Sequence, residues 1–319
     1  MESKGFAVGS CIGTYPLTIF LYCGIIFPLS LYLLFPGGTP FVFYLRERDV
    51  KMKTSLAIVG DLAYETTINR FHTFSQLGGS GYYTAVGAIG AKNNDFVLIS
   101  SVGEDFSFER IKINKSNLLI DIVPRQKTAC FTTTYINNSE RSFFADFGAL
   151  NYPPYRFVDD FITAQLIYFA GSNPHRQISW IHALLGKGYN GIIACDTFEK
   201  YCVDYPDIVM KVIEKSEIVF MNQFEQSILN YKPEKSKKTS IIKKGENGAD
   251  LFIPQRDIAH FIPTIEYNAE DTNGAGDILG GFFLSLILNG MDYGIALQQS
   301  VDFASLSVSK KGVEHLFNT

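Results

Sequence analysis

From residue 55 onward, short apolar runs alternate with amphipathic stretches, and this alternation limits the fold more than any other feature of the chain. The apolar runs have the length and composition of buried strands, at residues 56–59, 96–100, 166–169, 191–195, 218–221 and 239–243. The stretches between them have helical periodicity, at residues 82–91, 176–185 and 206–215. Such alternation predicts an α/β fold with a mostly parallel sheet covered by helices. Ligands of such sheets gather at the carboxyl ends of the strands.

Two segments interrupt the alternation. Residues 66–74 follow the first strand where a helix is expected, and residues 128–147 have the pattern of a hairpin. Phe131, Thr133 and Tyr135 alternate before a turn at residues 137–139, whose Asn-Asn-Ser sequence suits a hairpin turn. We predict that these segments pair into a small separate sheet that acts as a lid.

Residues 1–51 differ from the rest of the chain. No charged residue occurs from Gly5 to Leu45, and residues 15–35 are almost continuously apolar, which is long enough to cross a bilayer. Basic residues follow this stretch, so the main body would face the cytosol, although prolines and a glycine interrupt the stretch. Alternatively, the domain starts at Met52 and the upstream segment is an artefact of start-site choice. Residues 1–51 are therefore excluded from the fold prediction.

The composition excludes several classes of function. Of the 319 residues, 46% are hydrophobic and 19% are charged, so the chain can bury a sizeable core. The net charge is -4 and no basic stripe occurs, which argues against a nucleic-acid partner. The five cysteines form no C-x-x-C pair, and the histidines lack metal-binding spacing. Without residues 1–51 we expect a cytoplasmic protein; with them, a membrane-anchored one.

The strongest local motif is the heptad Asp271-Thr272-Asn273-Gly274-Ala275-Gly276-Asp277, which precedes an apolar helix. Three small residues at a helix N-terminus leave backbone N–H groups accessible, and the helix dipole favours an anion there. A phosphoryl group in transfer is such an anion. Asp277 lies in the first helical turn, where the same field favours its ionised form, and it can take the proton of an attacking hydroxyl.

The simplest alternative is a glycine-rich loop in which Asp277 only caps the helix. Other nucleotide-binding motifs are missing, because the chain has neither a G-x-x-x-x-G-K-[ST] sequence nor a G-x-G-x-x-G after its first strand. The full heptad, placed after several strands, favours phosphate chemistry.

With these motifs, residues 55–315 resemble the ribokinase-like (PfkB) carbohydrate kinase family, whose signature D-T-x-G-A-G-D matches residues 271–277 at every fixed position. The resemblance implies a three-layer α/β/α domain over residues 52–319 with a small β lid. It assigns Asp277 as the catalytic base and Gly274, Ala275 and Gly276 as the anion hole. ATP and Mg²⁺ are the implied cofactors, and a monovalent cation such as K⁺ is a further one.

Further matches to the family concern the nucleotide and the metal. Asn222-x-x-Glu225 follows a strand and resembles the family motif that orders Mg²⁺ and its waters, with Glu225 acting through water. A simple helix cap is the alternative for this pair. Lys244-Gly245-Glu246-Asn247-Gly248 resembles the G-x-x-G turn that lines the nucleotide. We therefore expect Lys244, Gly245, Gly248 and Thr272 to bind the nucleotide.

The N-terminal half resembles the acceptor site of the family. Asp61 ends the first strand at the position expected to bind acceptor hydroxyls, and Gly78, Gly79 and Ser80 match the di-glycine motif that opens a helix. Tyr83 stands where many sugar-specific members have Asn, and it can stack on a ring but lacks an amide's paired donor and acceptor.

We therefore predict an ATP-dependent kinase acting on a hydroxyl of a small sugar or sugar-like molecule. The alternatives are a nucleoside or inositol kinase of the same family, or a non-catalytic ligand-binding relative. Asp196, at the end of its strand, and Arg141, in the lid hairpin, are secondary candidates for ligand contact. The resemblance also makes a homodimer a candidate assembly.

Overall fold

The structure is a computed structural model that describes residues 6–12, 15–24, 27–34, 40–44, 54–68, 73–135, 141–256, 258–265 and 267–318. The chain divides into two units, Met1–Lys51 and Met52–Thr319. The first is an antiparallel sheet of β1 (Phe6–Ile12), β2 (Tyr15–Gly24), β3 (Phe27–Leu34) and β4 (Pro40–Tyr44). Within the described residues, no helix is both long and apolar enough for a membrane span. Both interpretations of residues 1–51 stay predictions.

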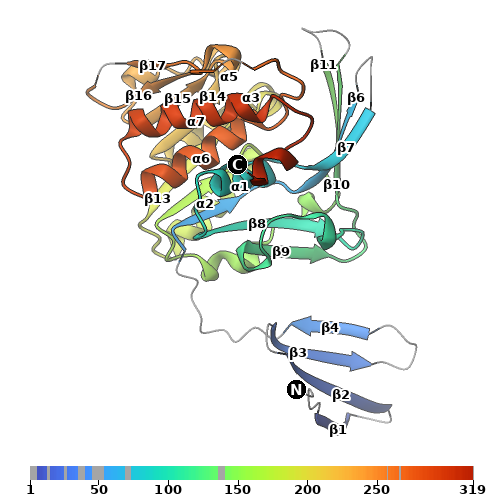
Figure 1. The fold of residues 1–319 in the computed structure, drawn as a ribbon. Coiled ribbons are helices and arrows are strands. Elements are labelled where there is room, and N and C mark those ends of the chain that lie inside the picture. The colour runs from blue at the N-terminus through green and yellow to red at the C-terminus, as the bar shows by residue number, and fades with distance from the viewer. Residues whose placement is uncertain are drawn as a thin grey trace. The chain divides into compact units, whose positions relative to one another are not determined.

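The second unit is built on a nine-stranded sheet (Figure 1). In spatial order its strands are β17 (Ala259–Phe261), β16 (Ala249–Phe252), β15 (Thr239–Lys243), β14 (Ile218–Asn222), β13 (Ile192–Asp196), β12 (Leu166–Phe169), β5 (Leu56–Val59), β8 (Phe96–Gly103) and β9 (Leu118–Val123). Neighbours from β15 to β9 run parallel, and β16 and β17 add an antiparallel edge. The predicted mostly parallel sheet is confirmed.

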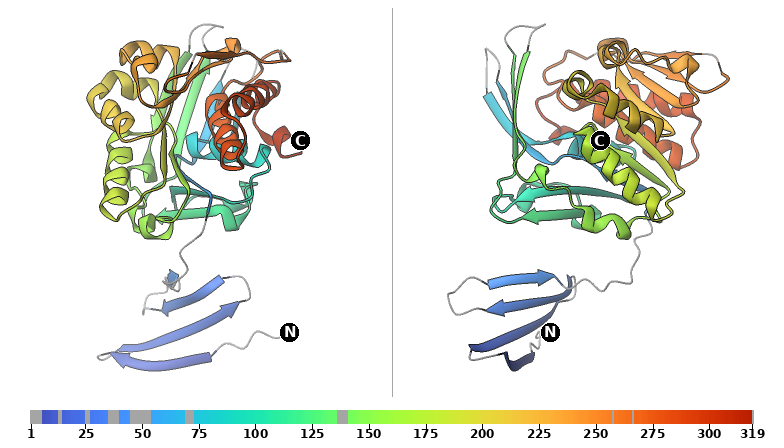
Figure 2. Two further views of the ribbon diagram at one scale, coloured as in Figure 1. Left: turned by 90° about the vertical axis from the view of Figure 1, so that its left-hand side faces the viewer. Right: turned by 180° about the vertical axis from the view of Figure 1, so that it is seen from behind.

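Helices cover both faces of this sheet, as the two views in Figure 2 show. One layer contains α1 (Ser80–Gly90), α6 (Ala275–Leu288) and α7 (Tyr293–Ser307), and the other contains α2 (Pro174–Gly186), α3 (Glu199–Asp204), α4 (Pro206–Glu214) and α5 (Gln223–Ile228). The three-layer α/β/α prediction is confirmed.

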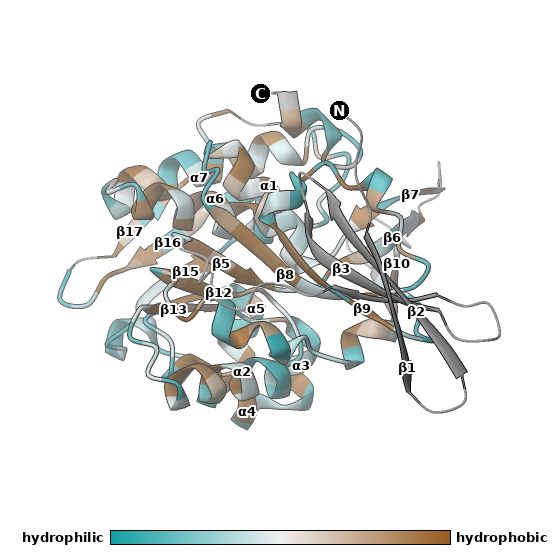
Figure 3. Ribbon diagram, turned by 90° about the horizontal axis from the view of Figure 1, so that it is seen from below, coloured by the Kyte–Doolittle hydropathy of each residue, from teal (hydrophilic) through white to brown (hydrophobic). Residues whose placement is uncertain are grey.

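The central strands are mostly apolar because both faces of the sheet are buried there, and Figure 3 shows the sheet as the hydrophobic centre of the domain. Along β8, Phe96 and Leu98 join the core under α1 and α6, whereas Val97 and Ile99 join the core under α2 and α4. This period of two is the geometry of a strand whose side chains alternate between faces.

A second, smaller sheet has the strand order β11 (Arg141–Asp146), β10 (Ala129–Tyr135), β6 (Ala63–Ile68) and β7 (Thr73–Gly78). Strand β10 runs parallel to β6 and antiparallel to β11 (Figure 1). The predicted small separate sheet is confirmed, although β6 already begins at Ala63, three residues before the predicted segment. Its role as a lid stays a prediction. The predicted turn at residues 137–139 lies outside the described residues.

Candidate active site

A large cleft opens where the carboxyl ends of the parallel strands face the second sheet. Its volume is about 1310 Å³. Five neighbouring strands each place a polar residue of the cleft wall at or just beyond their carboxyl ends: Asp61, Ser172, Asp196, Asn222 and Lys243. Because parallel strands all end at the same edge, these residues gather in one place, as the sequence predicts.

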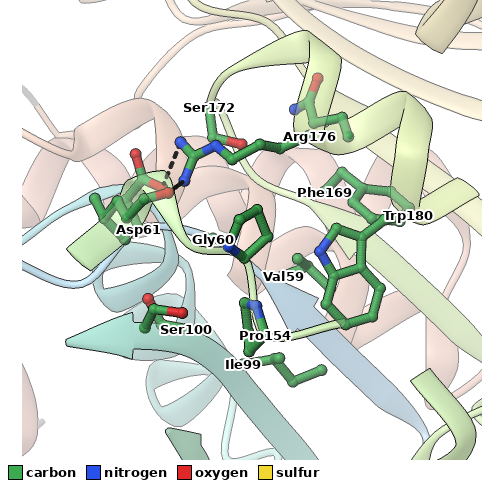
Figure 4. A pocket seen from close by; sticks show the side chains of 14 residues that line it. Val59, Gly60, Asp61, Ile99, Ser100, Pro154, Phe169, Ser172, Arg176 and Trp180 are labelled. Atoms are coloured by element: carbon green, nitrogen blue, oxygen red, sulfur yellow. Dashed lines mark hydrogen bonds and ion pairs between the residues drawn. The ribbon is translucent and has the colours of Figure 1, made fainter. Parts of the chain in front are cut away.

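A much smaller pocket of about 30 Å³ lies beside this cleft (Figure 4). Arg176 reaches from α2 toward Asp61, and Trp180 and Pro154 line the same pocket (Figure 4). This volume is enough only for water-sized molecules. A sugar and a nucleotide therefore require the large cleft.

Helix α6 begins inside the large cleft. Its N-cap residue Gly274 has φ 73°, in the left-handed region that glycine adopts without strain. A Cβ atom on Gly274 would lie 2.2 Å from Cγ of Tyr83, so no other residue fits there without displacing that ring. A Cβ atom on Gly276 would lie 3.2 Å from Nζ of Lys243. The unpaired N–H groups of a first helical turn and a nearby ammonium group together favour an anion.

Asp277 lies in the first turn of α6 and lines the cleft. Burial raises the pKa of this carboxyl well above its usual range, and the charge of Asp196 raises it further. Lys243 lowers the pKa, whereas Glu65 and Glu225 raise it. The sequence argument considered only the helix field, which favours the ionised form; burial acts in the opposite direction. Among the described residues, Asp277 has neither an ion-pair partner nor a hydrogen-bond donor.

Lys243 is the cation of this part of the cleft, and sequence reasoning missed it. Its Nζ donates to Oδ2 of Asp196 over 2.6 Å, and the hydroxyl of Tyr168 donates to the same oxygen over 3.1 Å. Burial opposes the charge on Lys243, but the carboxylates of Asp196, Glu225 and Asp277 raise its pKa above the ordinary value. Lys243 therefore stays protonated beside the N-terminus of α6.

Asn222 and Glu225 form a capping box at the start of α5. The Glu225 N–H donates to Oδ1 of Asn222, and the Asn222 N–H donates to Oε2 of Glu225, each over 2.8 Å. Thr197 also donates to Oε2, over 2.7 Å, and no described residue donates to Oε1. The helix-cap interpretation is thus confirmed, and one carboxylate oxygen is left for a further ligand.

This oxygen fits Mg²⁺, which prefers oxygen donors and keeps several of its waters. Within the part of the chain that the structure describes, no group of three or more acidic, histidine or cysteine residues could enclose a metal ion. The free oxygen of Glu225 fits contact with a water of the ion, and the role of Glu225 in holding Mg²⁺ stays a prediction.

Asp61 is placed at the other end of the cleft. Its Oδ1 lies 3.3 Å from Nη2 of Arg176 (Figure 4). The Asp61 N–H donates to Oγ of Ser80 at the start of α1. Burial raises the pKa of Asp61, and the charge and hydrogen bond of Arg176 oppose this shift. Arg176 also donates to the carbonyl oxygen of Leu150, so the guanidinium group is fixed in place.

Glu65 on β6 is a second carboxylate at this end, and sequence reasoning missed it. It accepts a hydrogen bond of 2.6 Å from the hydroxyl of Tyr83 and one of 2.9 Å from the N–H of Gly79. Gln76 on β7 donates to the Tyr83 hydroxyl over 3.1 Å and to Asp271 over 3.3 Å. Side chains of the second sheet thus contact both the di-glycine motif and the heptad.

The cleft brings together most of the residues predicted for the site. The following line it: Asp61, Gly79, Ser80, Tyr83, Asn222, Glu225, Gly245, Gly248, Thr272, Gly274, Ala275, Gly276 and Asp277. Gly78 lies behind this wall, where a Cβ atom would meet Cδ of Glu65 at 2.3 Å. The Lys244 side chain pairs with Asp250 on β16 and does not line the cleft. The side chain of Arg141 lies outside the described residues.

Comparisons with known structures agree on the fold. A nucleoside kinase of Burkholderia thailandensis, solved with inosine, has a TM-score of 0.70 at 15% identity over 81% of this chain and 93% of that chain. A ribokinase of Arabidopsis thaliana, solved with ribose and ATP, has a TM-score of 0.67 at 18% identity over 83% and 96%. A nucleoside kinase of Methanocaldococcus jannaschii has a TM-score of 0.65 at 21% identity over 82% and 94%. The fold is therefore that of the ribokinase-like kinases.

The model of the pfkB family carbohydrate kinases matches residues 53–319, and the chain belongs to this family. Among curated proteins, the deoxyribokinases of Salmonella typhi and Salmonella typhimurium are each 36% identical to the chain over 74 residues. That stretch covers 23% of this chain and 24% of each deoxyribokinase, so the match spans about a quarter of their length. The monovalent cation and the homodimer stay predictions.

Proposed function

We propose that this chain transfers the γ-phosphoryl group of ATP to a hydroxyl of a small sugar or sugar-like acceptor. The observation that supports this most strongly is the N-terminus of α6, where Asp277 lies in the cleft beside backbone N–H groups and the Lys243 ammonium. An anion-binding position suits phosphoryl transfer to an alcohol when it lies next to a carboxylate that no described residue pairs with or donates to.

In this reaction the acceptor oxygen attacks the γ-phosphorus, its O–H proton passes to Asp277, and the bond between the γ-phosphorus and the β,γ-bridging oxygen breaks to release ADP. The first turn of α6 and Lys243 stabilise the negative charge on the migrating phosphoryl group. Mg²⁺, when bound near Glu225, neutralises charge on the ATP phosphates. The raised pKa of Asp277 makes it a stronger proton acceptor than an exposed aspartate.

The acceptor binds between the sheet edge and the second sheet, where Asp61 and Glu65 can accept hydrogen bonds from hydroxyl groups. The second sheet covers the acceptor there, and the exclusion of water limits wasteful hydrolysis of ATP.

The test incubates the protein with ATP, Mg²⁺ and, in separate reactions, sugars, nucleosides and inositols. Mass spectrometry detects the phosphorylated product, and a coupled assay follows ADP. We expect ADP formation that depends on the acceptor, together with a phosphate ester of that acceptor. A protein that binds ATP but forms neither product with any class would be a non-catalytic relative, and the proposal would be wrong.

A further inference from the structure

A row of five aromatic rings lines the acceptor end of the cleft. We name it the aromatic wall; its members are Phe147, Phe131, Phe143, Phe198 and Tyr201. Successive ring centroids in this order lie 5.8, 5.7, 5.8 and 5.7 Å apart. These spacings are those of aromatic pairs in contact, so the rings form one continuous surface.

The wall joins two parts of the fold. Phe131 and Phe143 belong to β10 and β11 of the second sheet, whereas Phe198 precedes α3 beside the main sheet. In the parallel pairing of β6 and β10, Glu65 is opposite Phe131, so both side chains lie on the same face of the second sheet. A carboxylate and an aromatic surface therefore face the acceptor from one sheet.

The exposure of these rings distinguishes a binding surface from a buried core. Phe131 is 7% exposed and belongs to a small core with Ala129 and Leu150, which explains its presence without a ligand. Phe143 is 45% exposed, although it contacts rings on both sides. Its uncovered apolar face borders the cleft and favours a flat apolar ligand group.

Charges at this end favour an uncharged acceptor. Asp61 and Glu65 contribute negative charge, and two nearby cations among the described residues are already paired: Arg176 with Asp61, and Lys200 with Asp204. An acidic sugar would meet like charge, and neither of these two cations is free to bind it. A hydroxyl-bearing group, by contrast, can donate hydrogen bonds to these carboxylates.

The arrangement also orients the acceptor. The hydroxyl of Tyr83 donates to Glu65, and the ring of Tyr83 packs against Gly274, three residues before Asp277. Hydroxyl groups bound at Glu65 are therefore near the proposed base. The aromatic wall continues from Phe131, beside Glu65, toward Phe198 and α3. A molecule that contacts both Glu65 and the aromatic wall needs hydroxyl groups at one end and a flat ring at the other.

We propose that the acceptor is a nucleoside, whose sugar hydroxyls face Glu65 and Asp277 and whose base stacks on the aromatic wall. This inference rests on the proposed kinase function and names its acceptor class. A free pentose would satisfy the carboxylates but leave Phe143 uncovered.

The test measures kcat and KM for purine and pyrimidine nucleosides and for free ribose and deoxyribose. The variants Phe143→Leu and Phe198→Leu keep an apolar side chain but remove the flat ring. Phe144→Leu is the matched control, because Phe144 is the next residue of β11, lies on the opposite face and is 67% exposed.

We expect the unmodified protein to prefer a nucleoside to the free sugars by at least tenfold in kcat/KM. Each wall variant should raise the nucleoside KM about tenfold, as loss of one stacking contact does, with little change for free sugars and for ATP. The Phe144→Leu variant should behave like the unmodified protein. A preference for free sugar, or equal effects of Phe143→Leu on both acceptor classes, would overturn the inference.

Calorimetric titration with nucleosides separates this inference from the proposed function. Nucleoside binding that weakens in the two wall variants, but not in Phe144→Leu, supports the aromatic wall even if no acceptor is phosphorylated, and only the kinase proposal then fails. Phosphorylation of free sugars by a protein that does not bind nucleosides would support the kinase proposal and overturn the nucleoside inference.

Discussion

The two ends of the cleft are built in different ways. The phosphoryl end uses the first turn of α6, the α5 cap and one lysine, all fixed on elements of the main domain. The acceptor end uses side chains of the second sheet, of α1 and of the segment before α3, which meet only in the folded protein. The chemistry therefore depends on local motifs with defined backbone geometry, whereas acceptor choice depends on side chains from several elements.

The electrostatics of the two ends differ as well. At the phosphoryl end, Lys243 donates a hydrogen bond to Asp196, and its charge also lowers the pKa values of Glu225 and Asp277. At the acceptor end, the two carboxylates have different side-chain partners. Arg176 pairs with Asp61, and the hydroxyl of Tyr83 donates to Glu65. A substitution at the phosphoryl end should therefore change catalysis broadly, and one at the acceptor end should change mainly acceptor binding.

Apart from loss of the proposed base Asp277, the largest effect in this comparison is expected from Lys243→Met. Loss of the ammonium group removes the cation near the migrating phosphoryl group, and kcat should fall about 100-fold. The measurement is steady-state turnover with ATP and the preferred acceptor. Lys244→Met is the matched control, because its neighbour Lys244 pairs with Asp250 outside the cleft, and its kcat should change little. Equal losses in both variants would contradict the role of Lys243.

A smaller effect is expected from a substitution of Gly274. This residue of the phosphoryl end packs against Tyr83 of the acceptor end. Gly274→Ala should strain the left-handed backbone and push against the ring, and it should lower the free energy of unfolding by about 2–4 kcal/mol. Gly290→Ala is the control, since Gly290 has φ 84° but no atom within 4 Å of an added Cβ. Gly290→Ala should lower the free energy of unfolding by about 1 kcal/mol. Urea unfolding measures both, and equal losses would show that the Tyr83 contact is not tight.

The smallest effect is expected from Asp61→Asn. The neutral amide keeps the shape of the side chain but weakens hydrogen bonds from acceptor hydroxyls, so the acceptor KM should rise about fivefold to tenfold. The KM for ATP should stay unchanged because Asp61 lies at the acceptor end. Separate titrations of both substrates test this, and equal increases in both KM values would contradict the placement of the acceptor.

The difference between local motifs at the phosphoryl end and scattered side chains at the acceptor end also explains which residues could be predicted from the sequence. The heptad 271–277 and the pair of Asn222 and Glu225 are local, so spacing along the chain was enough to find them. Lys243 is the last residue of β15 and Lys244 is the first residue after it, and only the folded sheet determines which one faces the cleft. The choice of Lys244 followed the turn motif and overlooked the strand end beside it.

Glu65 and the aromatic wall could not be located from spacing alone. Strand β6 follows β5 of the main sheet but pairs only in the second sheet, and there Glu65 meets Tyr83 and Phe131. Strands β9, β16 and β17 were also missed. Their side chains are mostly only partly buried at the sheet edges, so their sequences lack the long apolar runs of the central strands.

The most direct test of the central claim is the pH dependence of kcat for the unmodified protein and for Asp277→Asn. A base must be ionised to act, so kcat of the unmodified protein should rise with pH through a pKa above that of an ordinary aspartate. Asp277→Asn should lose at least about 100-fold in kcat, lack this rise and still bind ATP. Near-normal turnover with the same pH profile in Asp277→Asn would contradict the account.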